Sequence, residues 1–365
     1  MPRSRLLIAL ALCSALGVSV TALGAPLQAQ PAPGPGGPPA VAVDAVQKRE
    51  VIAALDRQLR AYYAFPDVAS KVAAQLIAKE KAGGYAAATD SKSFAKALTE
   101  DLHALGRDKH FNVVYQPGAG PGPGGGGGGG PGGMDPARLS FGVDRVQRLP
   151  GNIGYLELRA FMSGKQVNEA ISNALNILRG TDAMIVDLRR NGGGEPATVA
   201  WLLSHFFAAD DKRHLNDIYT RPTNLTQQYW TNPSVSVRYT GPVFVLTSPR
   251  TFSGGEEAAY DFQTQKRGIV VGEVTGGGAN PGDMVPLAAG FKALIPSGRA
   301  INPITKTNWE GVGVQPDIAM PAPEALKFAH LALLRAEMAR TPDAQVKQQL
   351  AKLIADVEAG KGYVP

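Results

Sequence analysis

Cysteine is nearly absent from the sequence. The single Cys13 lies in an N-terminal segment that we expect to be removed, which leaves neither a disulfide nor a cysteine nucleophile in the mature chain. Charged residues make up only 19%, and the basic residues behind the net charge of +6 are scattered, so nucleic-acid binding is not favoured. The 5 histidines show no zinc-site spacing, and we expect no metal and no organic cofactor.

Long apolar runs are also missing, except near the N-terminus. There, residues 6–20 are apolar, follow Arg3 and Arg5, and precede small residues within 22–24. This pattern is typical of a secretory signal peptide, and the run is short for a membrane span. We therefore expect a signal peptide at 1–24, a periplasmic or extracellular location, and no stable membrane span after cleavage.

Glycine and proline are plentiful, with 43 and 28 residues, but they concentrate at 31–39 and 117–133. No Gly-X-Y period is present, which excludes collagen, and a hydrophobic content of 44% opposes global disorder. We expect a disordered linker at 25–40 and a Gly/Pro-rich surface loop at 116–138.

Hydrophobic periodicity predicts an α/β protein. Apolar residues at three- and four-residue steps predict a small helical domain at 41–108. Apolar strands such as 153–158 and 290–295 occur within 139–321, where strands alternate with helices, and this predicts a core with a central, largely parallel sheet. Residues 322–365 are predicted to form C-terminal helices.

Two glycine-rich turns follow buried strands, the position at which α/β folds hold catalytic groups. Ser253 stands between a strand and a helix, so it could cap the helix or act as a nucleophile beside the N–H of Gly254. The turn at 187–194 could be structural, or Gly192 and Gly193 could offer N–H groups to an oxyanion. Its glycine spacing does not fit a phosphate loop.

A histidine and an acid complete the candidate set. His110 lies at the boundary between the helical segment and a strand, where it could be structural or a general base. Of the other four histidines, three are predicted to lie in helices and His214 in a polar loop. Glu310 follows a tryptophan in a glycine-rich turn, where it could stabilise the turn or orient a base or nucleophile.

The order of these motifs along the chain resembles that of the carboxyl-terminal processing (tail-specific) serine peptidases. The order is His110, the Asn-Gly-Gly-Gly turn, the Ser253 segment, Gly-Glu-Val-Thr-Gly-Gly and Gly-Val-Gly-Val-Gln-Pro-Asp. Relatives of these peptidases include the tricorn protease core and interphotoreceptor retinoid-binding protein. The resemblance implies a ClpP/crotonase-like core. The tail-processing branch uses a Ser/Lys dyad, but the matching segment, 274–280, has no lysine and Lys266 does not match.

The resemblance is therefore to the tricorn-like branch, which implies Ser253 as nucleophile, His110 as general base and Glu310 as orienting group. Lys109 replaces the serine that precedes the histidine in tricorn, so Asp108 is a candidate to orient His110. The stretch from 115 to 149 is too short and too rich in Gly and Pro for a PDZ domain.

The implied activity is that of an endopeptidase acting on peptides or proteins through an acyl-enzyme. The implied oxyanion hole is formed by the N–H of Gly254 with that of Gly192 or Gly193. The alternative on the same fold is a non-catalytic protein that binds hydrophobic, retinoid- or lipid-like ligands.

Overall fold

The computed structural model describes residues 38–118 and 135–361. The expected signal peptide, most of the expected linker and most of the expected loop at 116–138 lie outside the described residues. Three helices come first: α1 (Ala45–Tyr62), α2 (Pro66–Lys81) and α3 (Ser91–Gly106). The side chains of Asp44 and Asp90 accept N–H groups at the starts of α1 and α3, as expected for N-caps.

A six-stranded sheet forms the centre of the following core. Its order is β12-β8-β7-β4-β3-β2, and every neighbouring pair is parallel except β2 with β3. The predicted α/β core with a largely parallel sheet is thus confirmed. The strands are β2 (Val143–Leu149), β3 (Ile153–Leu158), β4 (Ala183–Asp187), β7 (Val243–Thr247), β8 (Ile269–Gly272) and β12 (Ile318–Ala319).

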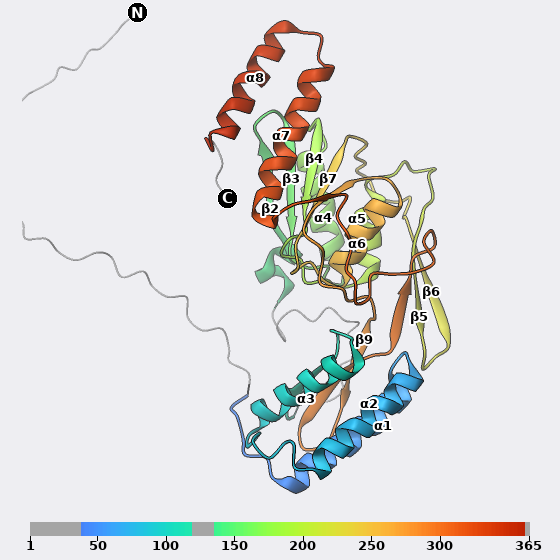
Figure 1. Ribbon diagram of the computed structural model, residues 1–365. Helices are drawn as coiled ribbons and strands as arrows, with labels where there is room; N and C mark the ends of the chain where they lie inside the picture. Colours follow the sequence, from blue (N-terminus) through green and yellow to red (C-terminus); the bar gives the residue numbers. More distant parts are fainter. Residues whose placement is uncertain (1–37, 119–134, 362–365) are drawn as a thin grey trace, which may run out of the picture. The chain divides into compact units, whose positions relative to one another are not determined.

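Helices cover both faces of this sheet (Figure 1). One face packs against α4 (Lys165–Leu178), α5 (Pro196–Ser204) and α6 (Gly254–Thr264). The other packs against α7 (Ala322–Arg340), on which α8 (Ala344–Glu358) lies. Because side chains alternate along a strand, buried neighbours such as Val245 and Leu246 join different cores.

Two small antiparallel sheets accompany the central one. In the first, β10 (Phe291–Pro296) pairs with both β1 (Asn112–Tyr115) and β9 (Gly282–Pro286). The strand expected at 290–295 therefore exists but lies outside the parallel sheet. Its Phe291 is buried with the side chains of α1 to α3, so a late segment of the chain completes the core of the N-terminal helices.

The second small sheet contains β5 (His214–Thr220), β6 (Leu225–Trp230) and β11 (Gly298–Ile301). The expectation of a polar loop around His214 is wrong. His214 begins β5 and stacks on Trp230 of β6, with ring centroids 4.2 Å apart.

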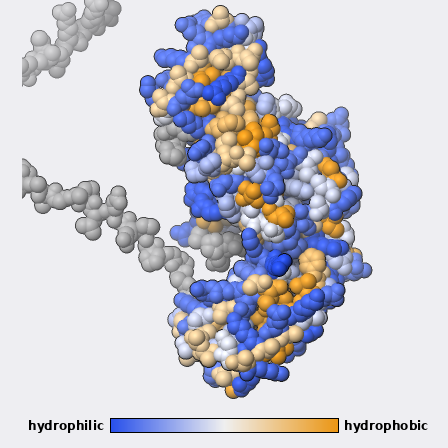
Figure 2. Space-filling model, in the orientation of Figure 1, coloured by the Kyte–Doolittle hydropathy of each residue, from blue (hydrophilic) through white to orange (hydrophobic). Residues whose placement is uncertain are grey.

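The surface is mixed in character. On the face that Figure 2 shows, hydrophilic residues surround smaller hydrophobic areas. Within 38–118 and 135–361, no helix is both long enough and apolar enough to cross a membrane.

Candidate active site

The turn between β7 and α6 holds Ser253 in a strained conformation. Ser253 is the N-cap of α6, with φ 51° and ψ −121°. A positive φ is unusual for a residue with a Cβ, and such strain costs about 1–3 kcal/mol and concentrates at functional sites. The turn is fixed by a hydrogen bond from the Phe252 N–H to the Asn191 carbonyl, at 3.0 Å.

Glu256, which the sequence analysis did not single out, anchors this turn. Its carboxylate accepts the N–H of Ser253 at 2.9 Å, the Gly277 and Gly278 N–H groups, and the Thr275 hydroxyl. Glu256 is fully buried, and burial raises its pKa although the four donors act in the opposite direction. The spacing Ser-x-x-Glu, which is that of a capping box, was the sequence signal that could have identified it.

His110 lies against the serine. Its Nε2 is 3.0 Å from Ser253 Oγ, within hydrogen-bonding distance. The histidine sits in the loop between α3 and β1, is 7% exposed, and packs its ring on Phe252 with centroids 4.7 Å apart. The structure therefore brings together the serine and the histidine that the sequence analysis selected.

Two carboxylates approach the same histidine. Asp108 Oδ1 accepts the backbone N–H of His110 at 3.0 Å and lies 3.6 Å from its Nδ1. Asn280 donates to the other oxygen of Asp108 at 2.9 Å. The phenol of Tyr63, at the end of α1, also interacts with Asp108, which adds to burial in raising the pKa of Tyr63.

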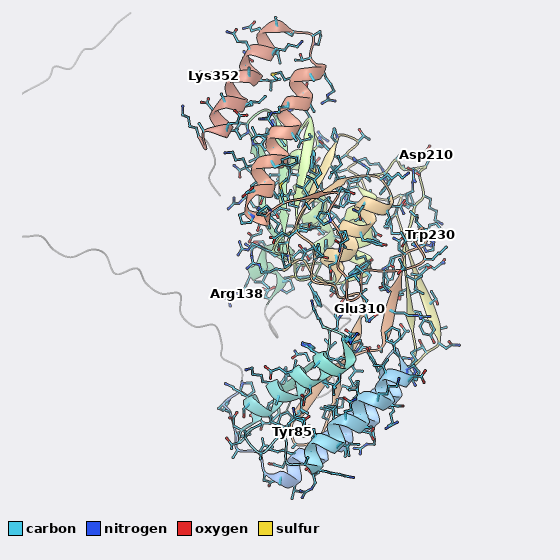
Figure 3. All side chains as sticks on the ribbon, viewed as in Figure 1. Tyr85, Arg138, Asp210, Trp230, Glu310 and Lys352 are labelled. Carbon is cyan, nitrogen blue, oxygen red and sulfur yellow. The ribbon has the colours of Figure 1, made fainter. Side chains whose placement is uncertain are left out.

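Glu310 is the second carboxylate. Figure 3 shows it between α3 and α6, and one atom each of Asp108, His110 and Glu310 lie within 4.8 Å of one another. Glu310 Oε2 accepts the Ala279 N–H at 2.5 Å. Burial, with the charge of Asp108 as the next cause, raises the pKa of Glu310 to about 8. Within the described residues, Glu310 Oε1 and His110 Nδ1 are buried without hydrogen-bond partners.

Three such groups could also hold a metal ion. Here most of the oxygen atoms already accept N–H donors, namely from His110, Asn280 and Ala279. Nε2 of the histidine faces Ser253. The donor set fits a hydrogen-bonded chain leading to the serine better than it fits a metal centre.

The glycine turn at 192–194 supplies N–H groups in a different way from that expected. The Gly192 N–H donates to the Arg159 carbonyl at 3.0 Å, and the Gly193 N–H donates to Asn191 Oδ1 at 2.8 Å. In the described parts of the chain, the N–H groups of Gly194 and Gly254 have no acceptor. A Cβ on Gly254 would lie 3.0 Å from the Gly194 nitrogen, so the two groups are close. The geometry therefore favours Gly194, rather than Gly192 or Gly193, as the partner of Gly254.

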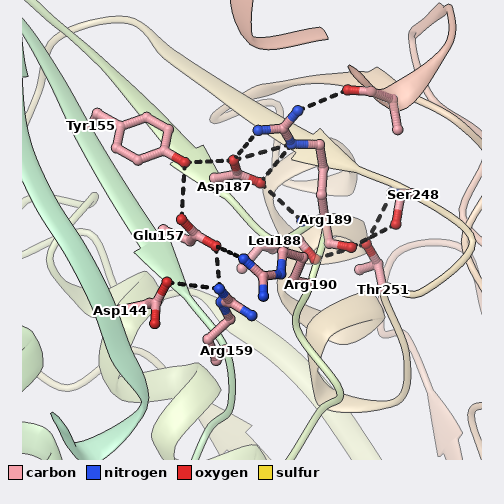
Figure 4. Close-up of polar contacts among 11 residues, drawn as sticks. Asp144, Tyr155, Glu157, Arg159, Asp187, Leu188, Arg189, Arg190, Ser248 and Thr251 are labelled. Atoms are coloured by element: carbon pink, nitrogen blue, oxygen red, sulfur yellow. Dashed lines mark hydrogen bonds and ion pairs between the residues drawn. The ribbon is translucent and has the colours of Figure 1, made fainter. Parts of the chain in front are cut away.

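A buried polar network holds these turns in place (Figure 4). Arg189 makes a bidentate contact with Asp187 at the end of β4, and Tyr155 donates to the same carboxylate at 2.7 Å. The hydroxyls of Ser248 and Thr251 donate to the carbonyls on the neighbouring strand end, those of Arg189 and Leu188. The network thereby locks the glycine turn to the serine turn.

Two cavities meet at Ser253. The smaller has a volume of about 270 Å³ and also contacts Gly194 and Gly254; its acidic lining residues are Glu195, Glu257 and Asp283. The larger, about 830 Å³, contacts His110. Its basic lining residues besides histidines are Lys109, Arg138, Arg159 and Arg190.

Two family models match the chain. Residues 152–320 match peptidase family S41, and residues 45–122 match the N-terminal domain of peptidase S41 in eukaryotic IRBP. Together they cover more than half of the chain, and they fall on the α/β core and on the helical segment.

Relatives agree with these matches. The chain is 30% identical to the chloroplastic carboxyl-terminal-processing peptidase 2 of Arabidopsis thaliana over an alignment of 191 positions that covers 48% of this chain and 35% of that protein. The chain thus spans about a third of the length of this relative.

Solved structures share the fold. A candidate peptidase from Parabacteroides merdae has a TM-score of 0.55 and 18% identity, covering 79% of this chain and 96% of that one. The tricorn protease has a TM-score of 0.50 and 15% identity, covering 86% and 37%. From its two matching domains, the chain belongs to peptidase family S41, a family of serine-type peptidases.

Proposed function

We propose that this protein is a serine endopeptidase that cleaves peptide bonds through an acyl-enzyme on Ser253. The single observation that carries the proposal is the 3.0 Å contact between His110 Nε2 and Ser253 Oγ, in a turn where the backbone of Ser253 is strained. A nucleophile in hydrogen-bond reach of a base, beside free N–H groups at a helix N-terminus, is the arrangement that acyl transfer requires.

In the proposed mechanism, His110 Nε2 takes the hydroxyl proton while Ser253 Oγ attacks the substrate carbonyl carbon. The N–H groups of Gly254 and Gly194 then donate to the oxyanion. His110 next gives its proton to the leaving amine, so the C–N bond breaks and an ester on Ser253 remains. A water molecule, deprotonated by His110, hydrolyses this ester and restores the serine.

The carboxylates would orient the histidine. Asp108 holds the backbone of His110 and lies near its Nδ1, while Glu310 Oε1 is the nearby buried acceptor without a partner. A proton on Nδ1 would face these carboxylates, of which Asp108 Oδ1 is 3.6 Å away, and would leave Nε2 as the acceptor beside the serine. We therefore assign Glu310 and Asp108 as positioning residues.

Labelling with an alkyl fluorophosphonate tests the nucleophile. Wild-type protein should be labelled on the peptide that contains Ser253, and Ser253→Ala should not be labelled. Ser163→Ala, an exposed serine elsewhere on the core, is the matched control and should label like wild type. Equal labelling of wild type and Ser253→Ala would contradict the proposal.

The hydrophobic-ligand carrier is not favoured by the site. Three carboxylates line the smaller cavity beside Ser253, whereas an apolar ligand needs a predominantly apolar pocket.

We also propose export, on the basis of residues 1–24 alone. The test is whether the full-length chain expressed in a bacterium is recovered in the periplasm or medium in a shortened form. Retention of the unshortened chain in the cytoplasm would contradict it.

A further inference from the structure

The smaller cavity beside Ser253 has an unusual charge. Three acidic residues line it, Glu195, Glu257 and Asp283, and none of its described lining residues is Lys, Arg or His. Its volume of about 270 Å³ lies just below the roughly 300–1,000 Å³ of pockets for drug-sized ligands, which suits a single long side chain. Tyr229 also lines it. The nearby charges of Glu257 and Glu195 add to burial in raising the pKa of that tyrosine to about 12.

Glu257 is the buried acid of this cavity. It follows Glu256 in α6, is only 4% exposed, and its Oε1 has no hydrogen-bond partner among the described residues. Asp261, one turn later on the same helix, is 1% exposed and also has an oxygen without a partner. Unpaired buried carboxylates are costly, and a cation in the cavity would compensate the carboxylate of Glu257, which lines it.

The position of the cavity indicates which part of a substrate enters it. The leaving amine must lie beside His110, because that residue protonates it. His110 lines the larger cavity and not the smaller one. The smaller cavity instead adjoins Gly194 and Gly254, the two N–H groups proposed for the oxyanion. It therefore lies on the acyl side of the cleaved bond.

We propose that this cavity is the specificity pocket for the residue whose carbonyl is attacked, and that Glu257 selects a positively charged lysine or arginine side chain there. The inference rests on the proposed peptidase function and deepens it. Glu195 and Asp283 add negative potential along the cavity, while Glu257 supplies the buried partner for the ammonium or guanidinium group.

Diphenyl phosphonate esters test this pocket without a known substrate. In these reagents an amino acid analogue carries phosphorus in place of the carbonyl carbon, so only the acyl-side side chain is presented. Ser253 Oγ forms a bond to phosphorus, phenol leaves, and His110 takes the serine proton. We would compare the lysine analogue with the norleucine analogue, which has a similar length and no charge.

The ratio of the two inactivation rate constants is the readout. For wild type we expect the lysine analogue to react about 30-fold faster or more. The uncharged norleucine analogue leaves the buried carboxylate of Glu257 without a partner, whereas the lysine analogue pairs with it. Glu257→Gln should reduce the ratio to within a few-fold of one. Asp283→Asn should reduce it by a smaller factor, since Asp283 is exposed. Glu50→Gln, exposed on α1, is the matched control and should keep the wild-type ratio.

The outcomes separate the two proposals. If wild type reacts equally with both analogues, or if Glu257→Gln keeps the wild-type ratio, the specificity pocket is overturned while the peptidase function stands. If neither phosphonates nor an alkyl fluorophosphonate modifies Ser253 in wild type, the peptidase function itself fails and this inference fails with it. A thermal unfolding curve verifies that Glu257→Gln is folded, and Asp283→Asn provides the second measurement if it is not.

Discussion

His110 Nε2 lies 3.0 Å from Ser253 Oγ, although 143 positions separate the two residues in the chain. The contact joins the loop after the N-terminal helices to the start of α6 in the core. β1 begins directly after the His110 loop and pairs with β10 in antiparallel orientation. This pairing fixes the position of the histidine relative to the serine. The helical segment and the loop that follows it are thus part of the candidate active site, because they carry Tyr63, Asp108 and the histidine.

The glycine turn gives a prediction with an internal control. A Cβ on Gly193 would lie 2.7 Å from Ser253 Cβ, and its φ of 101° is unfavourable for other residues. We expect Gly193→Ala to reduce the rate constant of fluorophosphonate labelling by about 100-fold, the usual effect of a misplaced reacting group. Gly192→Ala should stay within a few-fold of wild type, since a Cβ there meets nothing within 4 Å. Comparable losses in both variants would contradict this account, as measured by fluorophosphonate labelling rates.

Replacement by glutamine should change the free energy of unfolding differently at the two adjacent glutamates, Glu256 and Glu257. Glu256 accepts four donors, and a glutamine there would direct its NH₂ at some of them. Each buried donor that loses its acceptor costs roughly 1–3 kcal/mol, so Glu256→Gln should lower the free energy of unfolding by at least that amount. Glu257→Gln should not, because it removes a buried carboxylate with an unpaired oxygen. Urea unfolding at pH 8 measures both, and a larger loss for Glu257→Gln would refute the assignment.

Much of the fold could be predicted from the sequence because its signals are local. The apolar run at 153–158 gives β3, and Asp90 marks the start of α3. β5 and β6 were missed because strand residues such as Asn216 and Gln227 resemble a polar loop. The pairing of β10 with β1 depends on contacts between distant segments, which no local pattern encodes.

The site was predictable to the extent that it follows motifs. Ser253, His110 and Glu310 stand in motifs that could be recognised, and the structure brings them together. The choice among the glycines depends on which N–H groups are already bonded, and only coordinates show that Gly192 and Gly193 are engaged. The acid pocket likewise required the structure, since Glu195, Glu257 and Asp283 come from separate segments.

Activity should rise as Glu310 ionises. Burial and the charge of Asp108 raise the pKa of Glu310 to about 8, so it is protonated at lower pH and gains its charge as the pH passes that value. The charge of Glu256 also opposes ionisation of Glu310. Once formed, the Glu310 carboxylate would stabilise the positive charge that His110 takes on during the reaction. We expect the rate constant of phosphonate inactivation of wild type to increase through about pH 8, and Glu310→Gln to lack the increase.

At pH 9 the loss in Glu310→Gln should be on the order of 100-fold, the low end of general acid–base contributions. Phosphonate inactivation rates between pH 6 and 10 give the profile, and Glu50→Gln serves as control. An unchanged profile in Glu310→Gln would exclude this role and leave Asp108 as the positioning carboxylate.

The buried acids of α6 should make stability depend on pH. Burial raises the pKa of Glu257 from 4.5 to about 7, and burial with the charge of Glu257 raises that of Asp261 well above 3.8. Asn216 on β5 faces Glu257 and acts weakly in the opposite direction. The folded state therefore holds these protons more tightly than the unfolded state. Their contribution to stability is complete below the unfolded pKa values and is lost as the pH rises through about 7.

We expect Tm to fall between pH 5 and pH 8, and to fall less in Glu257→Gln, whose side chain is neutral throughout. Differential scanning calorimetry at matched ionic strength measures this, with Glu50→Gln as control. A Tm that increases over this range, or the same decrease in Glu257→Gln as in wild type, would mean that Glu257 is already ionised in the empty pocket.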